Sequence, residues 1–238
     1  MNIALIGYGK MGKTIEAIAL ERGHQVVLKI DVSNAQELNA ENISKADVAI
    51  EFTGPHTAFD NLVKLIDFGV PVVSGSTGWL EKMPQLLEEI NRNNGSFLYA
   101  SNFSIGVNLF FELNKKLAGL MHKHGSYAVS LEEIHHTEKK DAPSGTAITL
   151  AEQVMDVYTE KTKWVNDVLP RPEELLITSK RIDPAPGTHT ITYASEIDDI
   201  SITHTAHNRK GFALGAVLAA EYIKDKKGVF SMKDVLDL

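Results

Sequence analysis

The chain has 238 residues, of which 43% are hydrophobic and 23% charged, a composition typical of globular proteins and too apolar for intrinsic disorder. Its 24 Lys and Arg against 31 Asp and Glu give a formal net charge of −7, which argues against nucleic-acid binding because phosphate contacts need a basic surface. The lack of cysteine excludes disulfides, thiolate metal sites and a cysteine nucleophile, and fits a reducing compartment.

The first residues, 1–7, have neither the basic start nor the small-residue cleavage site of a signal peptide, so we interpret them as a β-strand. The longest apolar run, 212–220, is nine residues long. Spanning a bilayer takes roughly 20. We therefore expect a cytoplasmic protein that binds neither nucleic acid nor a membrane.

Residues 1–104 alternate short β-branched runs with helical stretches, a pattern typical of a parallel sheet built from βαβ units. Gly23 and Gly69 stand where helices end, and Pro55 suits a first helical position. The predicted strands are 2–6, 25–30, 47–52, 70–74 and 97–100, and the predicted helices are about 11–21, 55–68 and 83–93.

After residue 104 the pattern changes to helices near 106–122 and 144–158 and strands near 127–135, 175–182, 188–194 and 199–205. Short turns such as 184–187 between consecutive strands indicate an antiparallel sheet, and 156–174 reads as an irregular loop. A last helix, near 210–224, can dock on the first domain. We expect an α/β fold: a Rossmann-like parallel-sheet dinucleotide-binding domain (1–104 with 206–238) and an α+β substrate-binding and oligomerisation domain with an antiparallel or mixed sheet (105–205).

A G-x-G-x-x-G motif directly follows the first strand and opens the first helix. Its first glycine permits a tight turn, the second lets a pyrophosphate approach the backbone, and the third lets helix and strand pack closely. Asp31 ends the second strand, where a carboxylate can bind a ribose and repel a 2′-phosphate. The motif consists of Gly7, Tyr8, Gly9, Lys10, Met11 and Gly12. It predicts a dinucleotide site that favours NAD, with Lys29 as the residue that could admit NADP.

Two more loops follow strands of the same sheet, at the edge where α/β proteins bind ligands. Each alone is more often an ordinary turn, but beside a nucleotide loop both are expected to line the nicotinamide site. The candidate residues are Gly75, Ser76 and Thr77, followed by Ala100, Ser101, Asn102 and Phe103.

Segment 132–147 combines histidines, lysines and a helix start. His135, His136, Lys139 and Lys140 supply proton-transfer groups and positive charge, and Ser144 is a good N-cap. The amides of Gly145 and Thr146 at the helix N-terminus can then bind a carboxylate. The segment predicts a site for a dianionic substrate; a solvated charged loop before a capped helix is the alternative.

The other histidines predict less. His24, His56, His122, His124 and His189 are scattered, so we expect surface or packing roles and no metal site, whereas His204 and His207 could line the same cleft.

Over nearly its whole length the sequence resembles the dihydrodipicolinate reductase family. The resemblance rests on the glycine loop and on segments 51–53, 75–78, 101–108, 133–136 and 139–147. It implies a nicotinamide-dependent reduction of a cyclic dicarboxylate, dihydrodipicolinate or its 4-hydroxy-tetrahydro form, in the diaminopimelate and lysine pathway. By position, it implies that His135 and Lys139 are the acid/base pair, with Lys139 the preferred proton donor, and that His136, Ser144, Gly145 and Thr146 bind substrate. The resemblance also implies a homotetramer formed through the second domain.

Two features depart from the family pattern. The glycine loop is one residue shorter than is common, and Val32 follows Asp31 where many members have a basic residue. We therefore expect NADH, NADPH or both, with NADH preferred. The alternatives are another two-domain dehydrogenase, acting on an amino acid such as aspartate or homoserine, and a nucleotide-sensing protein without turnover.

Overall fold

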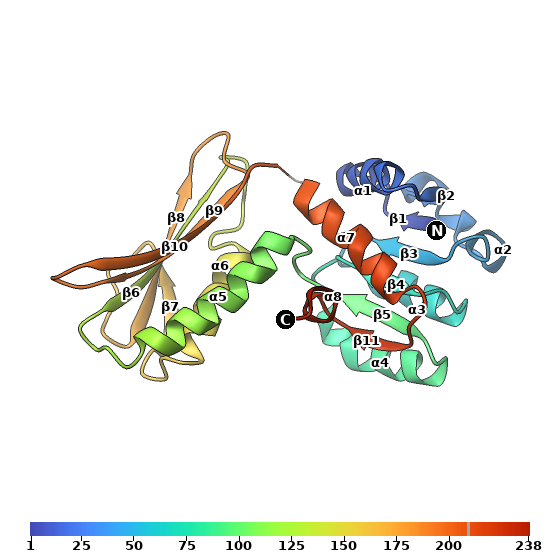
Figure 1. Cartoon of the computed structure of the whole chain (residues 1–238). Helices are drawn as coiled ribbons and strands as arrows, with labels where there is room; N and C mark the ends of the chain where they lie inside the picture. The colour runs from blue at the N-terminus through green and yellow to red at the C-terminus, as the bar shows by residue number, and fades with distance from the viewer. Residues whose placement is uncertain (209) are drawn as a thin grey trace. The chain divides into compact units, whose positions relative to one another are not determined.

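A parallel sheet of six strands, in the order β11-β5-β4-β3-β1-β2, forms the centre of the first compact unit (Figure 1). The computed structural model describes residues 1–208 and 210–238, and this unit comprises Met1–Ile105 and Lys210–Leu238. Its strands are β1 (Asn2–Ile6), β2 (Gln25–Ile30), β3 (Val48–Glu51), β4 (Val72–Ser74), β5 (Ser96–Tyr99) and β11 (Gly228–Phe230). The predicted Rossmann-like sheet is confirmed.

Helices cover both faces of this sheet because alternate residues of β1 enter two different apolar cores. Ile3 and Leu5 pack with α1 and α7, whereas Ala4 and Ile6 pack with α3 and α4. The helices of the unit are α1 (Lys10–Glu21), η1 (Val32–Glu37), α2 (Ala40–Ile43), α3 (Ala58–Asp67), η2 (Leu80–Lys82), α4 (Met83–Arg92), α7 (Lys210–Ile223) and α8 (Met232–Leu236). The last long helix therefore packs on the first unit, as expected.

The second unit, Gly106–Arg209, contains a five-stranded sheet in the order β10-β9-β6-β8-β7. Its strands are β6 (Ala128–His135), β7 (Lys163–Asn166), β8 (Glu174–Arg181), β9 (Gly187–Ala194) and β10 (Asp199–Ala206). Two helices, α5 (Ile105–Met121) and α6 (Gly145–Met155), pack against one face and enclose a third apolar core. The second α+β sheet is confirmed, and it is mixed.

Three details of the prediction were wrong. Strands β8 and β9 are not a hairpin: β6 lies between them, parallel to β8 and antiparallel to β9, so 184–187 is part of a crossover. Segment 156–174 contains β7, which gains its hydrogen bonds by pairing parallel with β8. Pro55 precedes its helix, because Gly54 O accepts from the amides of Thr57 and Ala58 in a turn before α3.

The sequence predicted a dinucleotide-binding domain of residues 1–104 with 206–238 and a substrate-binding domain of residues 105–205. These domain limits and roles stay a prediction. Within the described part of the chain, no helix combines the length and the apolar character that crossing a membrane requires.

Candidate active site

The glycine motif forms a tight loop between β1 and α1. Gly7 has a φ of +101°, and a Cβ on it would lie 2.1 Å from the carbonyl oxygen of Phe52. A Cβ on Gly12 would lie 2.3 Å from the carbonyl oxygen of Gly7. A Cβ on Gly9, in contrast, would meet nothing within 4 Å. The loop is therefore closely packed on its strand side and open where α1 begins.

Helix α1 starts at this opening without a capping side chain. Gly9 is its N-cap residue, and no described side chain bonds the first-turn amides as a cap. Free N–H groups and the positive end of the helix dipole suit a pyrophosphate, and the space at Gly9 lets one approach. These residues fit a bound dinucleotide.

Asp31 lies immediately beyond β2, beside this loop. The amides of Gly7 and Tyr8 donate to Ile30 O at 2.9 and 3.1 Å, which places the loop against the end of β2. The exposed Asp31 accepts from Val32 N through Oδ1 at 2.7 Å, and its own amide donates to Asn34. The carboxylate is thus fixed at the edge of the sheet, where a ribose acceptor is expected.

A buried carboxylate that the sequence prediction left without a role organises the next loop. Glu51, with no exposed surface, accepts from the hydroxyls of Ser74 and Ser76 at 2.6 and 2.7 Å and from Thr53 N at 2.8 Å. An acidic residue at the end of an otherwise apolar strand is the signal that could have identified it. Glu51 holds together the ends of β3 and β4.

The predicted nicotinamide-site residues differ in exposure. Thr77 and Ser101 are exposed and Gly75 and Ala100 half-buried, whereas Ser76, Asn102 and Phe103 are buried. Asn102 Oδ1 accepts from Ser104 N at 2.9 Å, and the Phe103 ring packs on Phe52 with centroids 5.6 Å apart. These buried residues shape the loops from within.

In the second unit, the strand alternation of β6 brings polar residues onto the buried face of the sheet. Val129 and Leu131 face the third apolar core, and Glu133 and His135 continue the same row. The register sets His189 of β9 opposite Glu133, and Arg181 of β8 beside His135. We call Glu133, His135, Ser144, Arg181 and His189 the buried polar cluster.

Glu133 is the centre of this cluster. Ser144 N donates to both of its carboxylate oxygens at 3.1 Å, Arg181 Nη2 lies 3.2 Å away and His135 Nδ1 3.3 Å away. Burial favours the neutral carboxyl, yet the contacts from His135 and Ser144 outweigh it and hold the pKa of Glu133 well below its ordinary value. A carboxylate fixed in this way orients His135.

His189 belongs to the same cluster, where it is buried and packs against His135, one of the two roles expected for it. Its Nε2 lies 3.2 Å from Ser144 Oγ and 3.8 Å from Glu133 Oε2, and its ring centroid is 5.2 Å from that of His135. Ser144 Oγ also accepts from Ala147 N as the cap of α6, so its hydroxyl proton is available to His189. Burial lowers the pKa of His189 to about 4, which keeps the ring neutral.

Potential ligand atoms of Glu133, His135 and His189 lie within 4.8 Å of one another, a closeness the sequence spacing did not reveal. The Arg181 guanidinium already supplies the positive charge beside Glu133.

The lysine loop after β6 is fixed by Arg181 as well. Lys139 Nζ lies 2.8 Å from both carboxylate oxygens of Asp141, and Arg181 donates to the backbone oxygens of Lys139 and Asp141 at 3.3 and 2.6 Å. At the end of this loop, Ser144 caps α6, next to the exposed Gly145. The structure thus joins His135, Lys139 and Ser144 through Glu133 and Arg181.

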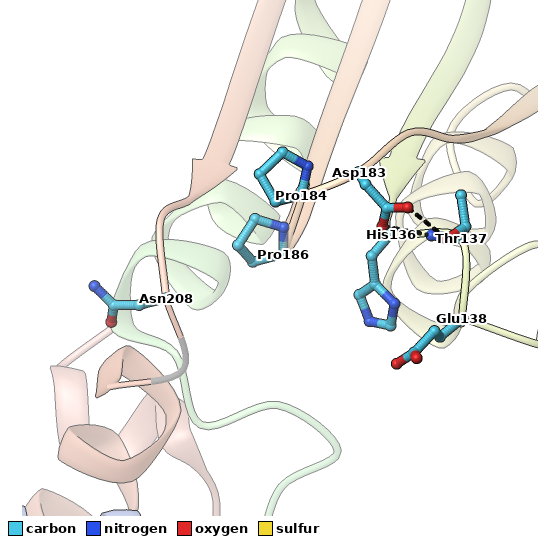
Figure 2. Close-up of a pocket in the computed structure, with 7 residues that line it drawn as sticks. All are labelled: His136, Thr137, Glu138, Asp183, Pro184, Pro186 and Asn208. Carbon is cyan, nitrogen blue, oxygen red and sulfur yellow. Dashed lines mark hydrogen bonds between the residues drawn. The ribbon is translucent and has the colours of Figure 1, made fainter.

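A pocket of about 390 Å³ lies in the second unit, at the neighbouring loops (Figure 2). Thr137 binds Asp183 through its amide and hydroxyl at 3.1 and 2.6 Å, which ties the loop after β6 to the loop after β8. The lining residues are His136, Thr137, Glu138, Asp183, Pro184, Pro186 and Asn208. Of the predicted substrate-binding residues, His136 lines this pocket.

Comparison with known proteins gives a consistent result over both units. Residues 1–103 match the family model "Dihydrodipicolinate reductase, N-terminus", and residues 106–236 match "Dihydrodipicolinate reductase, C-terminus". The 4-hydroxy-tetrahydrodipicolinate reductase of Christiangramia forsetii is 52% identical over 236 residues, covering 99% of this chain and 98% of that protein. That of Methanosarcina acetivorans is 34% identical, over 99% of this chain and 89% of that protein.

Solved structures show the same fold. A dipicolinate-bound dihydrodipicolinate reductase from Paenisporosarcina sp. TG-14 superposes with a TM-score of 0.77 at 23% identity, covering 98% of each chain. An amine dehydrogenase from Mycobacterium smegmatis superposes with a TM-score of 0.59 at 11% identity, covering 98% of this chain and 95% of the other.

Proposed function

This chain belongs to the dihydrodipicolinate reductase family, and we propose that it catalyses the NAD(P)H-dependent reduction of 4-hydroxy-tetrahydrodipicolinate to tetrahydrodipicolinate, in diaminopimelate and lysine biosynthesis. One hydride and one proton enter the substrate, and the 4-hydroxyl leaves as water. The observation that carries the proposal is the match to both family models, together with the buried polar cluster at the family's His-His-x-x-Lys segment.

A dinucleotide cofactor is held, in this proposal, by the glycine loop, Asp31 and the loops at 75–77 and 100–103. Bound NAD(P)H supplies the hydride. The tight packing at Gly7 and Gly12 and the open space at Gly9 support this assignment. Asp31 favours NADH, because a carboxylate can bond the ribose hydroxyls of NADH but repels the 2′-phosphate of NADPH.

His135 and Lys139 are the proposed acid/base pair. Because His135 Nδ1 faces the Glu133 carboxylate at 3.3 Å, its Nε2 is the atom left to exchange a proton with substrate. Lys139 is the preferred donor: its ammonium carries a proton, and its ion pair with Asp141 positions it. A positioned acid of this kind contributes about 10²–10⁴-fold to the rate.

The substrate's carboxylates require a positive local site in a chain whose net charge is −7. We assign one carboxylate to the N-terminus of α6, at Ser144, Gly145 and Thr146, where the helix dipole favours negative charge. His136, from the pocket in Figure 2, is assigned to substrate binding as well. No metal ion has a role in this mechanism, and the metal-free enzyme stays a prediction.

A cytoplasmic homotetramer completes the proposal. An interface on the face of β9 and β10 opposite the helices is supported by a row of paired hydroxyls that ends at Asp199. The pairs are Thr188 with Thr205, Thr190 with Thr203, and Thr192 with Ser201. Light scattering during size-exclusion chromatography should give four times the chain mass of 26.2 kDa. A monomer would contradict this part of the proposal.

The direct test of the activity is a spectrophotometric assay with the cyclic dicarboxylate and each reduced cofactor in turn. We expect substrate-dependent oxidation of NADH, and slower oxidation of NADPH. Cofactor binding without turnover would instead support a nucleotide-sensing protein, and turnover only with aspartate semialdehyde or a keto acid would support another dehydrogenase class.

A further inference from the structure

Three side chains form a compact group beside the nucleotide loop. Glu16, on the second turn of α1, accepts a hydrogen bond from the Tyr8 hydroxyl. It also forms an ion pair with Lys29, whose Nζ lies 2.6 Å from Glu16 Oε1. Lys29 Nζ is also 5.0 Å from the centroid of the Tyr8 ring. We call Tyr8, Glu16 and Lys29 the lysine clamp.

The clamp lies next to the proposed ribose site. Lys29 and Asp31 are separated by the buried Ile30, and Asp31 keeps an extended backbone with φ −132° and ψ 178°. Side chains two residues apart on an extended chain leave on the same side, so Lys29 is the cation on the side of Asp31. Val32, which is 93% exposed, offers no charge at the next position.

The ion pair of the clamp is well placed to hold Lys29. The Glu16 side chain is 18% exposed and also bonded by Tyr8, so it is fixed from two sides. The hydrogen bond between the two groups raises the pKa of Lys29 and lowers that of Glu16, which means that both stay charged and paired.

We propose that Glu16 determines the cofactor preference of this protein by holding Lys29 away from a 2′-phosphate. When Glu16 is ionised and paired with Lys29, the charges of Asp31, Glu16 and Lys29 add up to −1 beside the ribose, which disfavours NADPH. With Glu16 neutral, the same three residues sum to zero, and Lys29 is free to pair with the phosphate. Lys13 Nζ also lies 6.0 Å from the centroid of the Tyr8 ring, but its charge and that of Lys10 are the same in both states of Glu16, so they do not change this difference. The inference rests on the proposed dinucleotide site and explains its preference for NADH.

The test is the dissociation constant of NADH and of NADPH, measured by calorimetric titration of the full chain without substrate. Glu16→Gln keeps the size of the side chain and removes its charge. We expect NADPH to bind about fivefold to tenfold more tightly to this variant, because it gains one charge-assisted contact at a partly exposed site. The dissociation constant of NADH should change by less than about twofold.

Two further variants make the result specific. The double variant Glu16→Gln/Lys29→Gln should lose the gain for NADPH, because it lacks the released cation. Glu21→Gln removes an exposed glutamate from the other end of α1 and should change neither constant. Unfolding temperatures of all variants identify any loss of folded protein.

The outcomes separate the two proposals. An unchanged NADPH constant in Glu16→Gln, with normal NADH binding, overturns the clamp and leaves the proposed function intact. A gain that persists in the double variant also overturns it. A wild-type chain that binds neither dinucleotide overturns the proposed function itself.

Discussion

The nucleotide loop and the buried polar cluster use opposite means to build a site. The loop is made by the backbone: its glycines omit side chains, which leaves open space at Gly9 and amides without a side-chain cap at the start of α1. The cluster is made by side chains: Glu133 gathers contacts from residues as far along the chain as Arg181 and His189. It follows that a substitution that adds atoms should damage the nucleotide loop, whereas one that removes a side-chain group should damage the buried polar cluster.

The largest effect is expected from removing Lys139, the proposed proton donor. Lys139→Ala should lower kcat by about 10²–10⁴-fold, with little change in NADH affinity, because the lysine lies in the unit that does not carry the nucleotide loop. Steady-state kinetics and NADH titration measure both quantities. Lys140→Ala removes the exposed neighbouring lysine as a control, and a Lys139→Ala enzyme with full activity would end the assignment.

Adding a methyl group to the loop is the reciprocal experiment. In Gly7→Ala the Cβ would lie 2.1 Å from Phe52 O at a φ of +101°, so backbone strain and overpacking should lower the free energy of unfolding by about 2–5 kcal/mol and abolish NADH binding. Urea unfolding and calorimetry test this. Gly125→Ala, where a Cβ meets nothing within 4 Å, should be nearly neutral; similar losses in both variants would refute the special role of Gly7.

The cluster should also give the protein a characteristic pH dependence. His189 has a pKa of about 4 in the folded chain, against an ordinary value of 6.5. Its stabilising contribution is therefore fully present above pH 6.5 and is lost as the pH falls toward 4, because the unfolded chain binds the proton first; the loss is about 3 kcal/mol. Glu133 acts in the same direction, but below its ordinary value of 4.5.

Urea unfolding between about pH 7 and pH 4.5 measures this slope. His189→Gln should flatten it, whereas His124→Gln, at an exposed histidine, should leave it unchanged. An equal slope in wild type and His189→Gln would show that His189 does not carry the effect.

The smallest expected effect concerns Asp31, the side chain proposed to recognise the ribose at the loop site. Asp31→Ala should weaken NADH binding by about tenfold through loss of hydrogen bonds to the ribose, and weaken NADPH less. Titration of both cofactors measures the difference, with Asp225→Ala as an exposed control in the same unit. Equal losses for the two cofactors would contradict the ribose assignment.

The same contrast explains what could be predicted from the sequence. The glycine loop and the strands of the first sheet are local patterns, so residue spacing sufficed to place Gly7 to Gly12 and Asp31. The partners of Glu133 are set by strand register, and β8 and β9 were wrongly expected to be neighbours, so neither Arg181 nor His189 could be assigned to the cluster. Spacing within one segment reveals a helix terminus such as Ser144, but not a contact across a sheet.

The buried carboxylate of Glu51 determines whether the loops after β3 and β4 lose their conformational entropy during folding or during cofactor binding. By bonding Thr53, Ser74 and Ser76, it orders the ends of two adjacent strands as the chain folds. A dinucleotide that reaches these loops then immobilises little more, so more of its contact energy appears as affinity. Natural variation at Glu51 would accordingly be recognised first as a folding defect, and only in the surviving folded molecules as weaker cofactor binding.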